Sequence, residues 1–159
     1  MKKYLIVAAV SLLSTHAIAA DYAVIVIERP VNASADETWK KIGPFCALRD
    51  WFKTQCDITK GNETDVGSVR SVAGGRVSEV LVAKTKYSYT YTFPAPNPTA
   101  YHGTVEVVPE GAKKAKIVYT LFVDQESLAT PEAKAADKEQ RRKRFTEGVE
   151  TMVKMAEGK

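Results

Sequence analysis

The sequence predicts an α+β fold in which a curved, seven-stranded antiparallel sheet wraps around one long C-terminal helix. Runs in which apolar and polar residues alternate recur along most of the chain, and such runs indicate strands. Two short helical patterns follow the first of these runs, and one long amphipathic pattern closes the chain. The expected order is therefore one strand, two short helices, six strands and one long helix.

Residues 1–19 are predicted to be a signal peptide. Two lysines near the start precede an apolar run, and Ala17 and Ala19 supply the small residues of a cleavage site before Ala20. The apolar run is shorter than the roughly 20 residues that span a bilayer. No cysteine follows the run, so a lipoprotein is not indicated. We expect export to the periplasm, with full secretion as the alternative.

The mature chain, residues 20–159, is predicted to be one domain. Without Lys2 and Lys3, lysine plus arginine falls from 23 to 21 against 19 acidic residues, so the net charge falls from +4 to +2. A charge this small removes the main argument for a nucleic-acid partner. We expect a monomer that binds no nucleic acid.

Cys46 and Cys56 are predicted to form one structural disulfide, because the chain is expected in a compartment that permits disulfides. Closing this short loop would stabilise the fold by about 2–4 kcal/mol. A metal site is the alternative, but His102 is the only histidine of the mature chain. A redox pair would need the C-x-x-C spacing, which is missing, and we expect neither a metal nor a cofactor.

The N-terminal elements follow from local signals. Tyr22–Val31 is rich in β-branched residues and predicts the first strand. Ser34 and Glu37 have the spacing of a capping box, which starts a short helix. After a Gly-Pro break, apolar residues at helical spacing predict a second short helix that contains Phe45, Leu48 and Phe52.

Six further strands are separated by turn-rich segments. They are Cys56–Lys60, Ser68–Ala73, Val77–Ala83, Tyr87–Phe93, Tyr101–Pro109 and Lys113–Val123. Thr130 and Pro131 then supply a cap and a first-turn proline for a helix that ends at about Glu157. Its second half carries an apolar stripe of Phe145, Val149, Met152, Val153 and Ala156, which predicts packing against the sheet.

The strand Tyr87–Phe93 has an aromatic residue at every second position. Alternate side chains share one face of a strand, so Tyr87, Tyr89, Tyr91 and Phe93 should line one side of the sheet. This face is either the floor of a ligand pocket or ordinary core. Gly148 in the helix stripe leaves the same choice between room for a ligand and close packing, and close packing is the simpler interpretation.

The order of elements, together with "ASADETWKKIG", "VGSVR", "SEVL", "YSYTY", "NPTAYHGTVEVVPEG" and "FTEGVETM", resembles the START-like helix-grip superfamily (SRPBCC). The nearest branch is the polyketide cyclase/dehydrase and lipid-transport group, and the resemblance extends from Tyr22 to Ala156. Members enclose an apolar cavity between the curved sheet and the C-terminal helix. They bind lipids, hormones or polyketides there, and a minority perform chemistry on them.

The resemblance implies a set of ligand-binding residues in that cavity. They are Glu79, Tyr87, Tyr89, Tyr91, Tyr101, Phe145, Val149 and Val153. Glu79 matches a cavity acid that relatives use for water-mediated contact with the ligand. The loop that acts as a gate in hormone-receptor members of the superfamily is replaced here by the short segment Ala73–Arg76, and the loop that acts as their latch is replaced by "PAPNP". A hormone-gated switch is therefore not indicated.

The expected function is non-catalytic binding of an apolar or amphipathic small molecule, lipid-like or polyketide-like. The alternatives are a cyclase/dehydratase-like enzyme in the same cavity, with Glu79 as the candidate catalytic residue, and an interaction module with a filled core. Arg70 is expected at the strand surface or the cavity rim. Alternation places His102 with Thr104 and Glu106 on the solvent side of the sheet.

The basic run "RRKR", Arg141 to Arg144, begins the second half of the long helix. Four consecutive residues wind around a helix and do not form one patch. Asp137 and Arg141 have the favoured acid-first spacing of four, which predicts an ion pair on a solvated helix. Transient contact with a membrane surface is the alternative.

Overall fold

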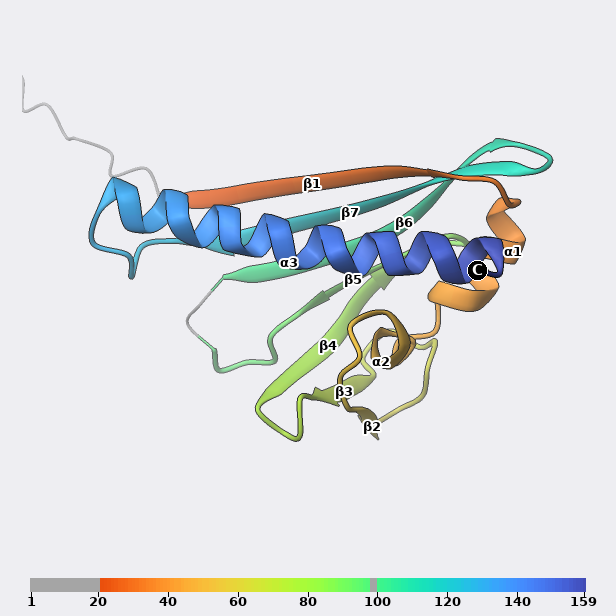
Figure 1. Ribbon diagram of the computed structural model, residues 1–159. Coiled ribbons are helices and arrows are strands. Elements are labelled where there is room, and N and C mark those ends of the chain that lie inside the picture. The colour runs from red at the N-terminus through yellow and green to blue at the C-terminus, as the bar shows by residue number, and fades with distance from the viewer. Residues whose placement is uncertain (1–20, 98–99) are drawn as a thin grey trace, which may run out of the picture.

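The computed structural model describes residues 21–97 and 100–159, and it has the α+β architecture expected from the sequence. The predicted signal peptide, residues 1–19, lies outside the described residues. Seven strands form one curved antiparallel sheet, and α3 lies along one face of it (Figure 1). The strands are β1 (Tyr22–Val31), β2 (Cys56–Lys60), β3 (Val69–Val72), β4 (Val77–Lys84), β5 (Ser88–Thr92), β6 (Tyr101–Gly111) and β7 (Lys114–Asp124). The helices are α1 (Ala35–Ile42), α2 (Leu48–Trp51) and α3 (Pro131–Glu157).

The strand order in the sheet is β1-β7-β6-β5-β4-β3-β2. Strands β2 to β7 follow one another as hairpins, whereas β1 pairs with β7 at the far edge. The two short helices connect β1 to β2 and so carry the chain from one edge of the sheet to the other. α1 lies at the C-terminal end of α3, and α2 lies alongside α3, farther from that end (Figure 1).

The helix ends form through the caps that the sequence indicates. The Ser34 hydroxyl accepts a hydrogen bond from the Glu37 N–H at 3.2 Å, and the Glu37 carboxylate accepts one from the Ser34 N–H at 3.1 Å. The Thr130 hydroxyl accepts from the backbone three residues on, with Pro131 in the first turn. α3 ends at Gly158, whose φ of 73° is the left-handed conformation that glycine adopts without strain.

The second short helix is shorter than expected. It spans only Leu48–Trp51, so Phe45 lies before it and Phe52 caps its C-terminus. The backbone hydrogen bonds that lead into α2, such as that from the Ala47 N–H to the Pro44 carbonyl, join residues three apart. These are tight turns, and they bring apolar side chains inward without a regular helix.

The disulfide prediction is confirmed. Cys46 and Cys56 are bonded, with their Cα atoms 5.5 Å apart. Cys46 lies just before α2 and Cys56 begins β2. The bridge therefore holds α2 against the edge of the sheet.

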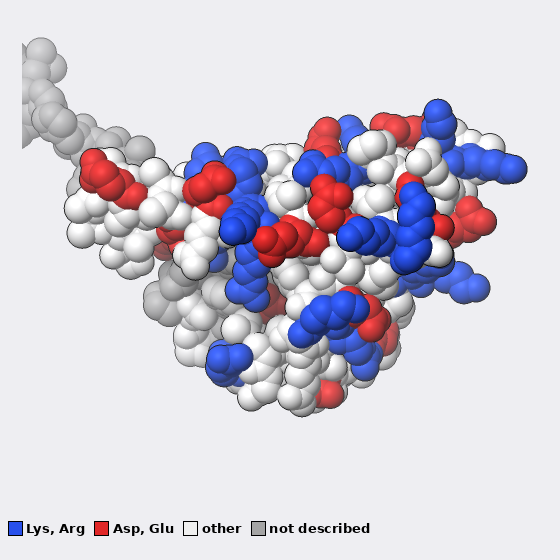
Figure 2. All heavy atoms as spheres, viewed as in Figure 1, with Lys and Arg blue, Asp and Glu red and all other residues white. Residues whose placement is uncertain are grey.

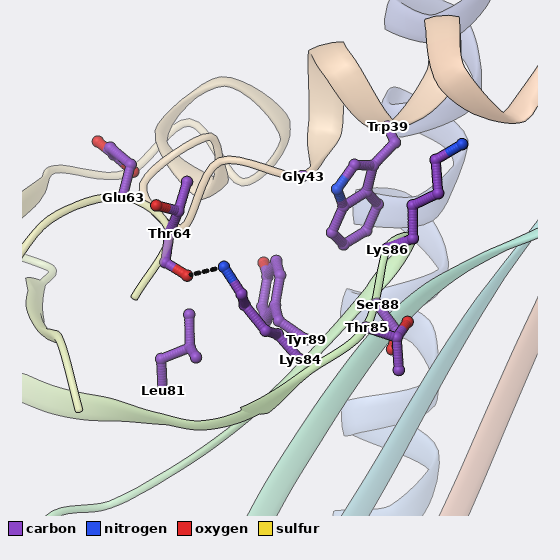
Figure 3. A pocket seen from close by; sticks show the side chains of 10 residues that line it. All are labelled: Trp39, Gly43, Glu63, Thr64, Leu81, Lys84, Thr85, Lys86, Ser88 and Tyr89. Atoms are coloured by element: carbon purple, nitrogen blue, oxygen red, sulfur yellow. Dashed lines mark hydrogen bonds between the residues drawn. The ribbon is translucent and has the colours of Figure 1, made fainter. Parts of the chain in front are cut away.

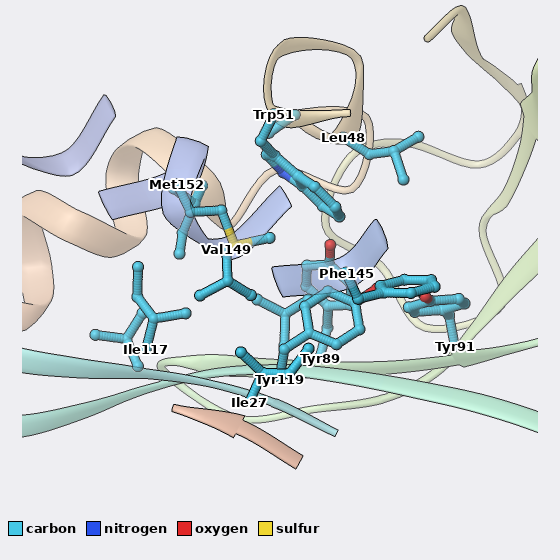
Figure 4. Packing of buried hydrophobic residues seen from close by; sticks show 14 of the residues in the cluster. Ile27, Leu48, Trp51, Tyr89, Tyr91, Ile117, Tyr119, Phe145, Val149 and Met152 are labelled. Atoms are coloured by element: carbon cyan, nitrogen blue, oxygen red, sulfur yellow. The ribbon is translucent and has the colours of Figure 1, made fainter. Parts of the chain in front are cut away.

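The core lies between α3 and the sheet (Figure 4). Phe145, Val149 and Met152 project from α3 toward Ile117 and Tyr119 of β7, and all five are buried. Their spacing of three and four residues on α3 is the stripe that the sequence predicts.

Gly148 serves close packing. The Phe52 ring lies against it, and a Cβ on Gly148 would lie only 2.6 Å from Phe52 Cε1. The absent side chain thus lets an aromatic ring pack directly on the helix backbone.

Acidic and basic side chains alternate along the exposed face of α3 (Figure 2). The expected pair forms, with Arg141 Nε 2.9 Å from the Asp137 carboxylate, and Glu139 lies 3.9 Å from Arg142 Nε. In the part of the chain that the structure describes, no helix has the length and hydropathy needed to cross a membrane.

Candidate functional site

An inner cavity of about 170 Å³ lies between α3, α2 and the sheet. Most of its lining is apolar or aromatic, and its charged residues are one carboxylate and two arginines. The residues that border it are Leu48, Phe52, Thr54, Val72, Ala73, Val77, Glu79, Tyr91, Phe93, Tyr101, Arg141, Arg144 and Phe145. An apolar pocket with a few polar groups is the usual composition of a small-molecule site.

A buried ion pair stands at the wall of this inner cavity. Arg70 on β3 lies opposite Glu79 on β4 in the antiparallel register. Arg70 is 0% exposed and Glu79 is 6% exposed. Arg70 Nε and Nη2 each lie 2.7 Å from Glu79 Oε2, and Nη1 donates to the Phe45 carbonyl. The pair crosses from one strand to the next beneath the segment that precedes α2.

Aromatic rings surround the guanidinium of Arg70. Its Cζ lies 4.2 Å from the centre of the Phe45 ring and 4.6 Å from that of Tyr91, distances at which a cation interacts with the ring face. Burial disfavours the charge, but neighbouring acidic groups, Tyr89 and Glu79 among them, raise the pKa of Arg70 above its usual value. Arg70 is therefore charged.

Glu79 uses one of its two carboxylate oxygens for Arg70. Both contacts from the guanidinium end on Oε2, and no side chain or backbone group of the described residues donates a hydrogen bond to Oε1. Burial raises the pKa of Glu79, and the charge and hydrogen bond of Arg70 oppose that rise. Since Glu79 borders the inner cavity, Oε1 is an acceptor available to a bound molecule.

Three tyrosine hydroxyls meet beside the cavity, which Tyr91 and Tyr101 border and Tyr119 does not. Tyr91 Oη lies 2.5 Å from Tyr119 Oη and 3.4 Å from Tyr101 Oη. Burial raises the pKa of Tyr101 to about 12 and that of Tyr91 and Tyr119 well above 10. All three hydroxyls are therefore protonated at neutral pH, and those of Tyr91 and Tyr101, which border the cavity, can donate or accept hydrogen bonds there.

Two arginines of α3 border the same cavity. Arg141 and Arg144 are three residues apart and so share a face of the helix. Arg141 Nε is held by Asp137, and the Arg144 guanidinium lies 5.3 Å from the centre of the Phe52 ring. Arg144 is exposed and Arg141 is half-buried, which places positive charge on the solvent side of the cavity.

A second, outer pocket of about 400 Å³ lies between α1 and the β4–β5 hairpin (Figure 3). Trp39 and Thr64 lie on one side of it, and Lys84 and Tyr89 rise from the hairpin on the other. Lys84 Nζ donates to the Thr64 carbonyl at 2.9 Å. The lysines that border this pocket are exposed, and no buried charged group borders it, so the inner cavity is the better candidate site.

Five of the eight predicted site residues border one of these two hollows. Glu79, Tyr91, Tyr101 and Phe145 border the inner cavity together. Tyr89 borders the outer pocket, and its buried hydroxyl makes no hydrogen bond of good geometry with the described residues. The rings of Tyr89 and Tyr91 are 6.2 Å apart, centre to centre.

The other three predicted residues border neither hollow. Tyr87 is half-buried before β5, and its hydroxyl donates to Asp36 of α1 at 2.7 Å. Val149 is fully buried in the core, and Val153 is half-buried against it. His102 is exposed on the outer face of β6, as alternation predicts.

The prediction that Arg70 lies at the strand surface or the cavity rim is wrong. Arg70 is fully buried because the β3–β4 hairpin places it directly across from Glu79, on the inward face that Val72 shares. The hairpin register was the signal that could have found this pair. With Glu79 inward, an arginine facing it across a short turn must also point inward.

Arg141 and Arg144 were also missed as site residues. The basic run does wind around the helix, but two of its members continue the apolar stripe toward the N-terminus. Arg141 lies four residues before Phe145 and seven before Gly148, both buried. Extending the stripe by one turn would have placed both arginines beside the cavity.

Solved structures with this fold include a Thermobifida fusca protein, with 22% identity over 84% of this chain and 92% of that one, and a TM-score of 0.68. A Bacillus cereus protein shares 20% identity over 83% and 94%, with a TM-score of 0.66. Norcoclaurine synthase from Thalictrum flavum shares 17% over 96% and 95%, with a TM-score of 0.60. At these identities the likeness shows a shared helix-grip fold. No curated protein matches significantly, whereas the sequence profile described as polyketide cyclase / dehydrase and lipid transport matches residues 23–157.

Proposed function

Because the chain belongs to the polyketide cyclase/dehydrase and lipid transport family, we propose that it binds a small amphipathic molecule in the inner cavity without changing it chemically. The observation that carries the proposal is the free Glu79 Oε1 in a cavity that is otherwise mainly aromatic and aliphatic. The apolar walls would hold the body of the ligand, and the carboxylate would orient its polar end.

The volume of the inner cavity favours a ligand about the size of one ring. An engineered cavity of about 150 Å³ accepts benzene, whereas sites for larger drug-sized ligands span about 300–1,000 Å³. At about 170 Å³, the inner cavity suits a single-ring molecule better than a long lipid or a polyketide chain. The norcoclaurine synthase structure named above holds dopamine and hydroxybenzaldehyde, which are also single-ring molecules.

Export to the periplasm is part of the proposal. The disulfide between Cys46 and Cys56 supports it, because disulfides persist in oxidising compartments and are rare in the cytosol. The N-terminal pattern of two lysines, an apolar run and Ala17-x-Ala19 supports it independently.

The rival function is a cyclase/dehydratase-like reaction in the same cavity, with Glu79 moving a proton. Burial raises the pKa of Glu79, which is what a general acid requires. The contact with Arg70 favours the carboxylate over the acid, which suits an orienting acceptor. We therefore place binding before catalysis.

Native mass spectrometry of the protein purified from the periplasm tests binding and export together. We expect a chain that begins at Ala20 and carries one non-covalently bound molecule of single-ring size. A chain that retains residues 1–19 and is recovered from the cytosol would contradict export. A protein that carries nothing and takes up no single-ring molecule would contradict binding.

Glu79→Gln should separate binding from catalysis. The amide keeps the shape, but its single oxygen must accept from Arg70, so an NH2 donor replaces the acceptor that faces the cavity. Affinity for the co-purified molecule should therefore fall about tenfold, or roughly 1.4 kcal/mol. Loss of a general acid or base would instead lower turnover by about 10²–10⁴-fold while binding survives. Isothermal titration calorimetry and product analysis measure the two effects. Glu106→Gln, at an exposed position on β6, is the matched control and should change neither.

A further inference from the structure

The inner cavity has two polar regions, Glu79 at its wall and the arginines of α3 near solvent, and each restricts which ligand can bind. Glu79 Oε1 is an acceptor, because an ionised carboxylate cannot donate. The Glu79–Arg70 pair is neutral as a whole, so the group that meets Oε1 need not be a cation. A neutral hydroxyl or aromatic amine satisfies it, whereas an ether or a carbonyl cannot.

The charges around the cavity leave one positive charge uncompensated. Glu79 balances Arg70, and Asp137 balances Arg141. Within the described residues no carboxylate forms an ion pair with Arg144, which lies over the Phe52 ring. The charge of Arg144 helps to oppose the rise in the pKa of Glu79, but Arg144 has no direct carboxylate partner in the described part of the chain, and one anionic group on the ligand would supply it.

The two arginines also have the geometry of an anion site. They share one face of α3, and among the described residues the hydrogen bonds that anchor Arg141 come from Nε, with 3.0 and 2.9 Å contacts to the two oxygens of Asp137. Its terminal nitrogens remain available to a carboxylate, which guanidinium groups bind with two hydrogen bonds. Aromatic rings, Tyr101 and Phe145 among them, border the cavity beside these charges.

We propose that the ligand is a single-ring hydroxy- or amino-carboxylate, with its hydrogen-bond donor on Glu79 and its carboxylate on Arg144 and Arg141. This inference rests on the proposed function and names the class of molecule that the cavity selects. The aromatic walls hold the ring, and the free carboxylate oxygen accepts a hydrogen bond from the donor. The exposed Arg144 and the half-buried Arg141 keep the anion near solvent. The anion therefore needs little desolvation, which makes the arrangement favourable.

Four probes and two variants test the inference by isothermal titration calorimetry. The probes are 4-hydroxybenzoate, 4-methoxybenzoate, phenol and benzene. 4-Hydroxybenzoate carries both the hydrogen-bond donor and the anion, and 4-methoxybenzoate carries only the anion. Phenol carries only the donor, and benzene carries neither. We expect 4-hydroxybenzoate to bind most tightly, with each omission of a polar group weakening binding by about tenfold or more.

Arg144→Gln should lower the affinity for both carboxylate probes about tenfold and change the affinity for phenol by no more than about twofold. Lys143→Gln is the control, because Lys143 is exposed and does not border the cavity, and it should change no probe. The carboxylate effect should also shrink at high salt, since the arginines lie near solvent.

The outcomes distinguish this inference from the proposed function. If phenol binds as tightly as 4-hydroxybenzoate and Arg144→Gln changes no affinity, the inference that the arginines bind a ligand carboxylate is wrong, although the proposed binding of a single-ring molecule is still supported. If 4-methoxybenzoate binds as tightly as 4-hydroxybenzoate, the inference that the ligand donates a hydrogen bond to Glu79 is wrong. If no probe binds, benzene included, the proposed function itself fails. The comparison of the four probes with one another uses the wild-type protein, so it holds even if a variant folds poorly.

Discussion

Arg70→Met should lower the free energy of unfolding by about 3–5 kcal/mol, because it leaves the Glu79 carboxylate buried without its counter-charge. The substitution also removes the donor to the Phe45 carbonyl and the cation between the aromatic rings. Urea unfolding followed by circular dichroism measures the loss. A loss below about 1 kcal/mol would mean that the pair contributes little or is not buried in solution.

The loss in Arg70→Met should depend on pH. Burial raises the pKa of Glu79 above its ordinary value of 4.5, and Arg70 opposes that rise. Without Arg70 the pKa of Glu79 in the folded protein rises further. In the folded variant Glu79 is then stable as the neutral acid. The loss in free energy of unfolding relative to wild type is therefore small below the pKa of Glu79 in the unfolded chain, and it grows as pH rises toward and through the pKa of Glu79 in the folded variant. Unfolding curves at several pH values should show this direction.

Two further variants separate the charge from the size of the side chain. Arg70→Met combined with Glu79→Leu replaces both charges with apolar groups, and at least half of the lost stability should return. Arg76→Met changes an arginine in the nearby turn, where the side chain is exposed and donates only to the Ala73 carbonyl. It should alter stability by no more than about 0.5 kcal/mol.

Phe145→Ala should lower the free energy of unfolding by about 3–5 kcal/mol as well. The ring is 7% exposed and packs against Phe52 and Tyr119, with ring centres 4.9 and 5.1 Å away. Because Phe145 also borders the inner cavity, its truncation enlarges that cavity. A two-ring probe such as 2-naphthol should then gain affinity relative to phenol. A stable variant with unchanged probe selectivity would contradict the placement of this ring.

The matched control for Phe145 is Phe122→Ala on β7. Phe122 is half-buried on the outer face and contacts Tyr22 at a centre distance of 4.5 Å. Its loss should cost about 1 kcal/mol and leave probe binding unchanged. Phe145→Leu retains most of the volume, so it gives a folded variant for the probe experiment if the alanine variant is too unstable.

Local sequence patterns predicted most of the architecture because local physics determines those features. The capping residue Ser34 satisfies free N–H groups at the start of α1, and Thr130 does the same for α3, whatever the rest of the chain does. Strand alternation in β5 and β7 follows from the two-residue period of the backbone. One bridge between Cys46 and Cys56 follows from the number of cysteines in the mature chain.

Half of the predicted ligand-binding residues do not border the inner cavity, and this could not be predicted without the complete sheet. Tyr87, Tyr89 and Tyr91 alternate along one segment, yet only Tyr91 borders the inner cavity. The curvature of the sheet and the packing of α1 turn Tyr89 toward the outer pocket and Tyr87 toward Asp36. Period-two alternation fixes a face, but it does not say what covers each position on that face.

The fold class, the order of elements, the helix caps and the disulfide could be predicted from the amino-acid sequence, since each depends on residues close together or on the number of cysteines. The burial of Arg70 against Glu79, and the position of Arg141 and Arg144 beside the cavity, became evident only from the three-dimensional arrangement of the strands and helices. A charged residue on a strand or a helix is ordinarily exposed, and its burial depends on a partner that long-range pairing supplies. Strand pairing across the β3–β4 turn and the docking of α3 on the sheet supply those partners here.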